Sequence, residues 1–194
     1  MTFQALIQSL NLSSKQCDLL DQYTHLLLQW NAIHNLTGAK TTQSVQENIL
    51  DSLYPLTFIY PFQSALDVGS GGGFPALPLS IVLENTHFIL VEPRLKRFGF
   101  LQNVCAQLNL KNIELICARL QDIPQRDKVE LITSRAVMSA PKLIAYSKRF
   151  LSPQGYYLFY KGLDFSQEMP GVTKNECFVR SDRIYFYKSS QARN

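Results

Sequence analysis

The chain has 194 residues, of which 46% are hydrophobic and 18% are charged, and its formal net charge is +4. This length fits one domain with a small helical addition, and the hydrophobic fraction is sufficient for a full core. The mild positive charge permits an anionic partner such as RNA without requiring one. No apolar run approaches the roughly 18 residues of a membrane span, so we expect no membrane association and no secretory leader.

The first 60 residues show the periodicity of helices. We expect an N-terminal helical extension over residues 1–60, packed as a single globular unit with a domain of residues 61–194. The expected helices cover 2–10, 19–30 after an N-cap at Ser13 or Ser14, and 44–56.

From residue 65 onward, strand-like and helix-like segments alternate, which predicts a parallel sheet with helices on both faces. Two further strand-like runs, at 176–180 and 183–188, predict a hairpin at the sheet edge. The expected strands are 65–68, 87–91, 113–117, 129–133 and 155–160, and the expected helices lie near 76–84, 95–109 and 139–151.

A glycine-rich loop follows the first of these strands, in the run Ala-Leu-Asp-Val-Gly-Ser-Gly-Gly-Gly-Phe-Pro at 65–75. A strand that opens into such a loop and then a helix is where an α/β sheet binds a nucleotide-like ligand. The dinucleotide pattern G-x-G-x-x-G would need a glycine at Phe74, so it is broken. S-adenosylmethionine carries an ammonium group and no phosphate, so it suits Asp67 at the strand end better than a pyrophosphate does. A glycine-rich turn without a ligand is the plainer alternative.

Glu92 ends the second expected strand. An acid in this position can accept hydrogen bonds from both ribose hydroxyls of an adenosine. It supports an adenosyl ligand without separating S-adenosylmethionine from NAD, and a turn or cap residue is the alternative.

The four cysteines lack the C-x-x-C spacing of a zinc site or a redox pair. We expect reduced thiols in a cytoplasmic protein, with no metal and no disulfides. The cysteines are Cys17, Cys105, Cys117 and Cys177.

Two segments before the glycine loop are distinctive, namely Trp-Asn-Ala-Ile-His-Asn-Leu-Thr-Gly at 30–38 and Asn-Ile-Leu-Asp-Ser at 48–52. With them the chain resembles the bacterial 16S rRNA guanine-N7 methyltransferases, small-subunit methyltransferase G or glucose-inhibited division protein B. The resemblance extends from about residue 19 to residue 162. Other matching segments are 67–78, Lys96-Arg97, Phe100-Leu101, Ala118-Arg119, 134–136 and Lys161-Gly162.

The resemblance implies a class I S-adenosylmethionine-dependent methyltransferase fold. This is a Rossmann-like α/β fold with a mostly parallel seven-stranded sheet, a C-terminal antiparallel hairpin and an N-terminal helical extension. It also implies S-adenosyl-L-methionine as cofactor and methylation of guanine N7 in 16S rRNA, at guanine 527 of the 530 loop. The implied partner is 16S rRNA or the small ribosomal subunit, and we expect a monomer. The implied cofactor-binding residues are Asp67, Gly69, Ser70, Gly71, Gly73, Phe74, Glu92, Leu120, Gln121 and Arg135.

The chain departs from the family pattern at three positions. Asn48 stands where the family usually has His, Gln121 where it usually has an acid, and Glu92 where it often has Asp.

Guanine N7 has an in-plane lone pair and no proton to remove, so its methylation needs positioning rather than a base. The candidate catalytic residues are therefore Arg135, Arg119 and Asn35. Arg135 follows the fourth strand, and its planar fork suits guanine or a phosphate. The alternatives are a structural salt bridge for Arg135, a helix-start residue for Arg119 and a cap or turn for Asn35.

Three basic residues are candidates for contact with substrate RNA, namely Lys96, Arg97 and Lys161. A solvated lysine is the alternative for Lys161. Solvated helix faces are the simpler reading of the other basic residues, Lys40, Arg94, Lys142, Lys148 and Arg149.

Other functions remain open at this stage. One is a methyltransferase of a small molecule or a protein on the same fold, because fold does not set substrate. Another is a non-catalytic ribosome-assembly factor that binds RNA with a vestigial cofactor site.

Overall fold

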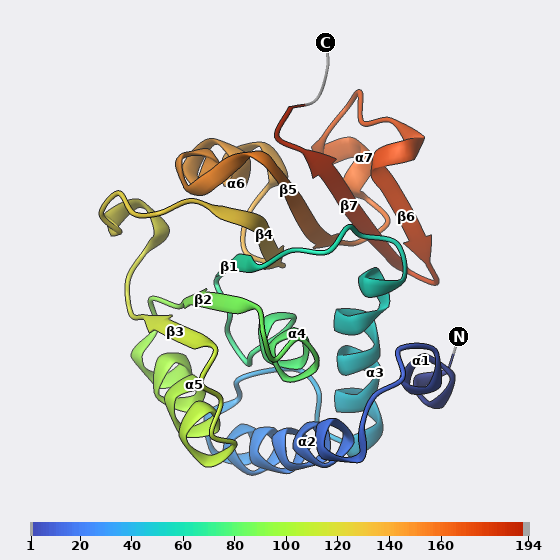
Figure 1. Cartoon of the computed structure of the whole chain (residues 1–194), viewed down its shortest axis with the longest axis vertical. Coiled ribbons are helices and arrows are strands. Elements are labelled where there is room, and N and C mark those ends of the chain that lie inside the picture. The colour runs from blue at the N-terminus through green and yellow to red at the C-terminus, as the bar shows by residue number, and fades with distance from the viewer. Residues whose placement is uncertain (1, 192–194) are drawn as a thin grey trace.

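The computed structural model describes residues 2–191 and has an α/β architecture built on one central sheet (Figure 1). The seven strands lie in the order β3-β2-β1-β4-β5-β7-β6. The pairs among β1 to β5 are parallel, and β7 runs antiparallel to β5 and β6. The predicted parallel sheet and hairpin are confirmed. The strands are β1 (Ser64–Val68), β2 (His87–Val91), β3 (Ile113–Ile116), β4 (Val129–Arg135), β5 (Leu151–Lys161), β6 (Cys177–Arg180) and β7 (Arg183–Ser189).

Helices cover both faces of this sheet, as the alternating pattern predicts. The N-terminal helices share one face with α4 and α5, while α6 and α7 lie on the other (Figure 1). The α-helices are α1 (Phe3–Ser9), α2 (Ser14–His34), α3 (Thr42–Leu53), α4 (Ala76–Val82), α5 (Leu95–Gln107), α6 (Ala140–Ser147) and α7 (Phe165–Glu168). The 3-10 turns are η1 (Tyr54–Thr57), η2 (Leu120–Asp122), η3 (Lys148–Phe150) and η4 (Lys174–Glu176).

The N-terminal helices begin at well-formed caps. The Ser13 hydroxyl oxygen accepts from the Gln16 N–H and the Gln16 side-chain oxygen accepts from the Ser13 N–H, so the first turn of α2 has a complete capping box. Thr41 and Ser44 form the same arrangement at the start of α3. These polar exchanges satisfy N–H groups that a helix start leaves without partners, which explains why both helices begin where they do.

The N-terminal helices belong to the same core as the sheet. Leu20 and Leu27 of α2 and Ile49 of α3 are buried in one cluster with Leu77 of α4 and Phe100 of α5. Removal of the N-terminal helices would therefore expose the apolar face that α4 and α5 present. The division of the chain at residue 60 stays a prediction, and residues 192–194 of the second unit lie outside the described residues.

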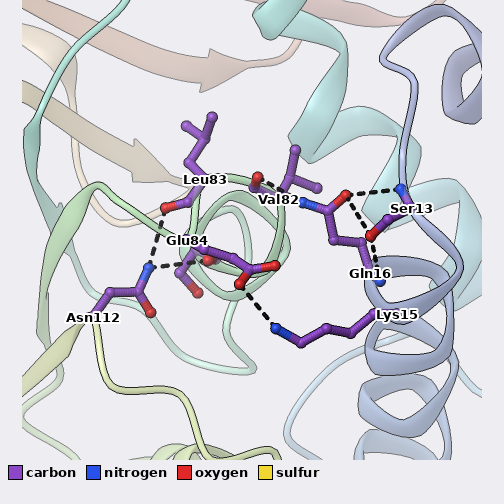
Figure 2. Close-up of polar contacts among 8 residues, drawn as sticks. Ser13, Lys15, Gln16, Val82, Leu83, Glu84 and Asn112 are labelled. Carbon is purple, nitrogen blue, oxygen red and sulfur yellow. Dashed lines mark hydrogen bonds and ion pairs between the residues drawn. The ribbon is translucent and has the colours of Figure 1, made fainter.

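Side-chain hydrogen bonds fix the carboxyl end of α4, the helix that follows the glycine loop (Figure 2). Gln16 of α2 donates to the Val82 carbonyl at 2.9 Å, and Lys15 pairs with Glu84 at 2.9 Å. Asn112, just before β3, donates its amide to the carbonyls of Ser80, Leu83 and Thr86 at 3.0 to 3.2 Å. These bonds satisfy carbonyls that the helix end leaves without partners.

The expected helix 139–151 is wrong at its end. The α6 helix stops at Ser147, a 3-10 turn follows, and Leu151 already belongs to β5. The register between β4 and β5 then shifts, so that Val129 pairs with Leu151 but Leu131 pairs with Tyr156. Pro153 falls in this irregular stretch, where a residue without an N–H is tolerated in a strand. The short α7 helix was not predicted. None of the described helices is long and apolar enough to cross a membrane.

Candidate functional site

The glycine loop joins β1 to α4 at the carboxyl edge of the sheet. The N–H groups of Gly69 and Ser70 donate to the Val91 carbonyl of β2 at 2.8 and 3.2 Å. Gly69, Gly71 and Gly73 all have positive φ angles, of 72°, 56° and 95°. Glycine adopts this left-handed backbone without the steric penalty that a Cβ brings, so these residue types are required by the shape of the loop.

The Asp67 side chain lies buried beneath this loop, with 1% of its surface exposed. Its Oδ1 accepts a hydrogen bond of 2.8 Å from the Thr133 hydroxyl of β4. Its Oδ2 is buried and accepts none from the described residues. Burial raises the pKa of Asp67 to about 7, although the neighbouring Ser70 hydroxyl, the Thr133 hydrogen bond and the charge of Arg135 oppose the shift. The free protein thus holds a costly acceptor that a bound cation would satisfy.

The Glu92 carboxylate supports the loop from the end of β2. One oxygen accepts from the Gly71 N–H and the other from the Arg94 N–H, both at 2.9 Å. Glu92 is 2% exposed, so the two predicted acids lie together at neighbouring strand ends. A carboxylate has about four acceptor positions, so these two bonds leave capacity for ligand hydroxyls.

The space above the loop differs from one glycine to the next. A Cβ on Gly71 would meet nothing nearer than 3.7 Å, the nearest side chain being Arg97 of α5. A Cβ on Gly69 would lie 2.5 Å from the Val137 side chain, and one on Gly73 would clash with Leu77. The loop is therefore open at Gly71 and closed at its two ends.

These features fit S-adenosylmethionine. The Asp67 oxygen without a hydrogen bond suits the ammonium group of S-adenosylmethionine, and the open space at Gly71 has room for the rest of the ligand. Glu92 lies beside this space through its bond to the Gly71 N–H, and its contact with the ribose hydroxyls stays a prediction of the sequence.

The wall of the site comes from the N-terminal helix α2. The Tyr23 hydroxyl donates a 2.6 Å hydrogen bond to the Gly72 carbonyl, and the Tyr23 ring meets Phe74 edge-on at 5.5 Å. Tyr23 is fully buried, and burial raises its pKa well above the usual value, so it is a neutral donor. Sequence periodicity marks Tyr23 only as an apolar helix position, and no motif signals its bond to the loop.

Arg135 ends β4 and points back into the protein. Its guanidinium lies 4.5 Å from the centre of the Phe74 ring and donates a 2.7 Å hydrogen bond to the Asn48 amide oxygen. It also lies 3.5 Å from Asp51 Oδ2. Burial lowers the pKa of Arg135, and the charge of Asp51 opposes that shift. Arg135 thus forms a structural ion pair, which is the alternative that the sequence leaves open for it. Asn48 serves as its hydrogen-bond acceptor.

Asp51 and Ser52 together link α3 to three strands of the sheet, since Asp51 meets Arg135 of β4 and two residues of β7 and Ser52 meets β5. Its Oδ1 accepts from the Tyr185 hydroxyl at 2.8 Å and from Arg183 Nε at 3.2 Å, both in β7. The next residue, Ser52, receives the Tyr160 hydroxyl of β5 on its carbonyl at 2.8 Å. The Asn-Ile-Leu-Asp-Ser segment therefore attaches α3 to the carboxyl edge of the sheet.

Leu120 and Gln121 lie in the 3-10 turn η2. Arg149 donates to the carbonyls of Leu120, Gln121 and Ile123 at 3.1, 3.1 and 2.7 Å. The sequence predicts a solvated Arg149, whereas in the structure Arg149 holds this turn. Arg119 is exposed at the position that begins η2, which matches its helix-start alternative.

The candidate RNA-binding residues differ in exposure. Lys96 is exposed in the first turn of α5, and Arg97 reaches toward Gly71. Lys161 is 9% exposed, and its ammonium donates to the Met138 carbonyl at 2.9 Å and to Glu168 at 2.7 Å. The alternative of a solvated Lys161 is therefore wrong.

Asn35 is the exposed C-cap of α2 and has the left-handed conformation that this position favours. The neighbouring Asn31 is buried and holds the following loop, because its amide donates to the Ala39 carbonyl at 2.8 Å and accepts from the Thr37 N–H at 2.9 Å. The structure thus gives Asn35 the predicted cap and turn geometry. Within residues 2–191 no group of three or more His, Cys, Asp or Glu side chains is arranged to hold a metal ion.

This strand order, with an acid-glycine loop after β1 and a second acid after β2, defines the class I S-adenosylmethionine-dependent methyltransferase fold. The sequence profile described as rRNA small subunit methyltransferase G (GidB) matches residues 16–194. The chain belongs to this family.

Relatives of known name support the family membership. The chain is 55% identical over 167 residues to the ribosomal RNA small subunit methyltransferase G of Helicobacter hepaticus, covering 85% of this chain and 90% of that protein. It is 48% identical over 174 residues to the protein of the same name from Helicobacter pylori strain 26695, covering 90% and 97%.

Solved structures of low sequence identity share the fold. Coclaurine N-methyltransferase bound to N-methylheliamine and SAH has a TM-score of 0.56 at 19% identity, covering 81% of this chain and 56% of that one. M. jannaschii TYW2 in complex with AdoMet has a TM-score of 0.56 at 16% identity, covering 73% and 74%.

Proposed function

We propose that this protein transfers a methyl group from S-adenosylmethionine to N7 of a guanine in 16S rRNA, namely guanine 527 in the 530 loop. Membership of the rRNA small subunit methyltransferase G family supports the reaction class and the substrate RNA. The observation that carries the cofactor is the buried Asp67 oxygen without a partner, beneath a glycine loop that is open at Gly71. The N7 position and the nucleotide number come from the resemblance of the motifs.

The mechanism we propose is positioning without a general base. S-adenosylmethionine supplies a methyl group on a sulfonium, which is already a strong electrophile. Guanine N7 needs no deprotonation, so the protein must align N7 with the methyl and the sulfur. Asp67 and Glu92 hold the cofactor, and the Tyr23 bond keeps the glycine loop in shape.

Arg135 acts in this scheme as a positioning residue. It packs on Phe74 of the loop and binds Asn48 and Asp51 of α3, so it fixes the two sides of the site relative to each other. We propose that Arg119, Lys96 and Arg97 contact the RNA from the exposed rim. A catalytic role of Asn35 and a contact of Lys161 with the RNA stay predictions from the sequence pattern.

Mass mapping of 16S rRNA tests the substrate. We expect that deletion of the gene removes one N7-methyl group at guanine 527 and that expression of the intact chain restores it. An unchanged modification at that nucleotide after deletion would reject this substrate.

Replacement of Gly71 by Ala tests the cofactor site. The methyl group has room in the free protein, but it lies in the open cradle and the positive φ angle strains any side chain. We expect calorimetry to show at least a tenfold loss of S-adenosylmethionine affinity. Gly99→Ala is the matched control, because its Cβ meets nothing within 4 Å and its backbone is helical. Equal affinities of the two variants would contradict the assigned site.

A further inference from the structure

A polar cavity of about 780 Å³ opens between α1, α3, the 38–39 loop and the turn that joins β6 to β7. Asn48 and Asp51 line it from α3, and Arg180 and Arg183 line it from the hairpin. The function proposed above gives this cavity no role.

The wall of the cavity holds the Asp51 carboxylate, a hydrogen-bond acceptor, beside arginine side chains, which are donors. Asp51 is 6% exposed, and its Oδ2 accepts no hydrogen bond from the described residues. This oxygen lies 3.2 Å from Arg183 Nε and 3.5 Å from Arg135 Nη1, contacts of ion-pair distance without hydrogen-bond geometry. Arg183 donates its Nε–H to Asp51, and within residues 2–191 no hydrogen bond engages its terminal nitrogens.

The cavity adjoins the cofactor site through Arg135. This side chain binds Asn48 on the cavity side and covers Phe74 of the glycine loop on the other. The hairpin turn lies at the same edge of the sheet, because Ile184 pairs with Lys161 at the end of β5. In an open α/β sheet, ligands bind outside the carboxyl ends of the strands, so a substrate here would lie beside the cofactor.

We propose that Asp51 and Arg183 recognise the Watson–Crick edge of the guanine to be methylated. That edge presents the O6 acceptor next to the N1–H and 2-amino donors, which matches the Arg183 guanidinium next to the Asp51 carboxylate. Adenine presents the opposite order and would place a donor on Arg183 and an acceptor on Asp51. Recognition through this edge leaves N7 free to face the methyl donor. The proposal rests on the proposed function, since it assumes that guanine is the target.

Inosine at the target position tests the contact with Asp51. Inosine keeps N7, O6 and N1–H and lacks only the 2-amino group. Small-subunit particles reconstituted with guanosine or inosine at position 527 would be compared as substrates of the full-length protein. We expect inosine to lower kcat/KM at least tenfold, because a carboxylate loses a hydrogen bond. In Asp51→Asn the guanosine rate falls and the difference between the two nucleotides disappears.

A matched control and a second variant complete the design. Lys128→Gln alters an exposed residue at the start of β4, on the opposite edge of the sheet, and should keep the full inosine penalty. Arg183→Gln should raise KM for the particle while S-adenosylmethionine affinity stays within twofold, which a folding defect would not produce.

Equal use of guanosine and inosine by the unaltered protein would overturn the proposal while guanine N7 methylation stands. An inosine penalty that persists in folded Asp51→Asn would also overturn it. If neither particle gained an N7-methyl group, the proposed function itself would fail.

Discussion

At the scale of single residues, Asp67 is the group whose charge state should govern the cofactor site that we propose. Its raised pKa places the titration near neutral pH, where a kinetic experiment would record it as an apparent basic group. In the positioning mechanism this titration affects cofactor binding and leaves the chemical step unchanged. The pH dependence should therefore appear in KM for S-adenosylmethionine and be absent from kcat at saturating cofactor. A matching limb in kcat would instead indicate a general base.

The raised pKa of Asp67 also makes the stability of the free protein depend on pH. An unfolded Asp ionises near 3.8, and the folded one near 7, so folding favours the proton between these values. Stability from this group is therefore present at low pH and is lost as the pH rises from about 4 to 7.

Asp67→Asn removes this titration. We expect urea unfolding to show that the variant gains stability relative to the unaltered protein between pH 5 and pH 8, by about 3 kcal/mol. Its affinity for S-adenosylmethionine should fall and should no longer rise over the same interval. A constant stability difference between the two proteins from pH 5 to 8 would contradict the titration of Asp67.

At the scale of elements, α2 holds the glycine loop by the hydrogen bond from Tyr23 to Gly72. Tyr23→Phe keeps the ring contact with Phe74 and removes that bond. We expect a loss of about 1 kcal/mol in the free energy of unfolding and a severalfold weaker affinity for S-adenosylmethionine. Tyr60→Phe, at an exposed tyrosine, is the control and should change neither quantity. A variant that lost stability with full cofactor affinity would limit Tyr23 to a structural role.

Elements with strong local signals were predictable from the sequence, and contacts between distant elements were not. The strand that ends at Asp67, the glycine loop and the strand before Glu92 follow from hydrophobic runs and glycine spacing. By contrast, Asp51 contacts Arg183 and Tyr185 of β7, far along the chain, and helical periodicity says nothing about a partner on another element. The sequence does not predict the end of α6, because Ser-Lys-Arg-Phe at 147–150 contains no glycine or proline that would mark the end of a helix.

At the scale of the whole molecule, one apolar core joins the N-terminal helices to the sheet. The single tryptophan, Trp30, lies in α2 and packs edge-on against Phe100 of α5 at 5.7 Å. Its fluorescence therefore reports on the contact between the N-terminal helices and the rest of the fold. We expect urea unfolding followed by this fluorescence and by far-ultraviolet circular dichroism to give coincident transitions. An earlier fluorescence transition would reveal that the helical extension separates first.

The pair of arginines beside Asp51 also bears on how the enzyme releases its product. The methyl transfer that we propose moves one positive charge from the sulfur of the cofactor to the guanine ring. In the recognition we propose, that ring then lies against Arg183 and close to Arg135, with a single carboxylate, Asp51, between them. Like charges at such distances repel, so the reaction itself weakens the hold on the modified nucleotide. The methylated particle should therefore bind the protein with a larger Kd than the unmethylated particle. The ratio of the two Kd values should fall as salt is added.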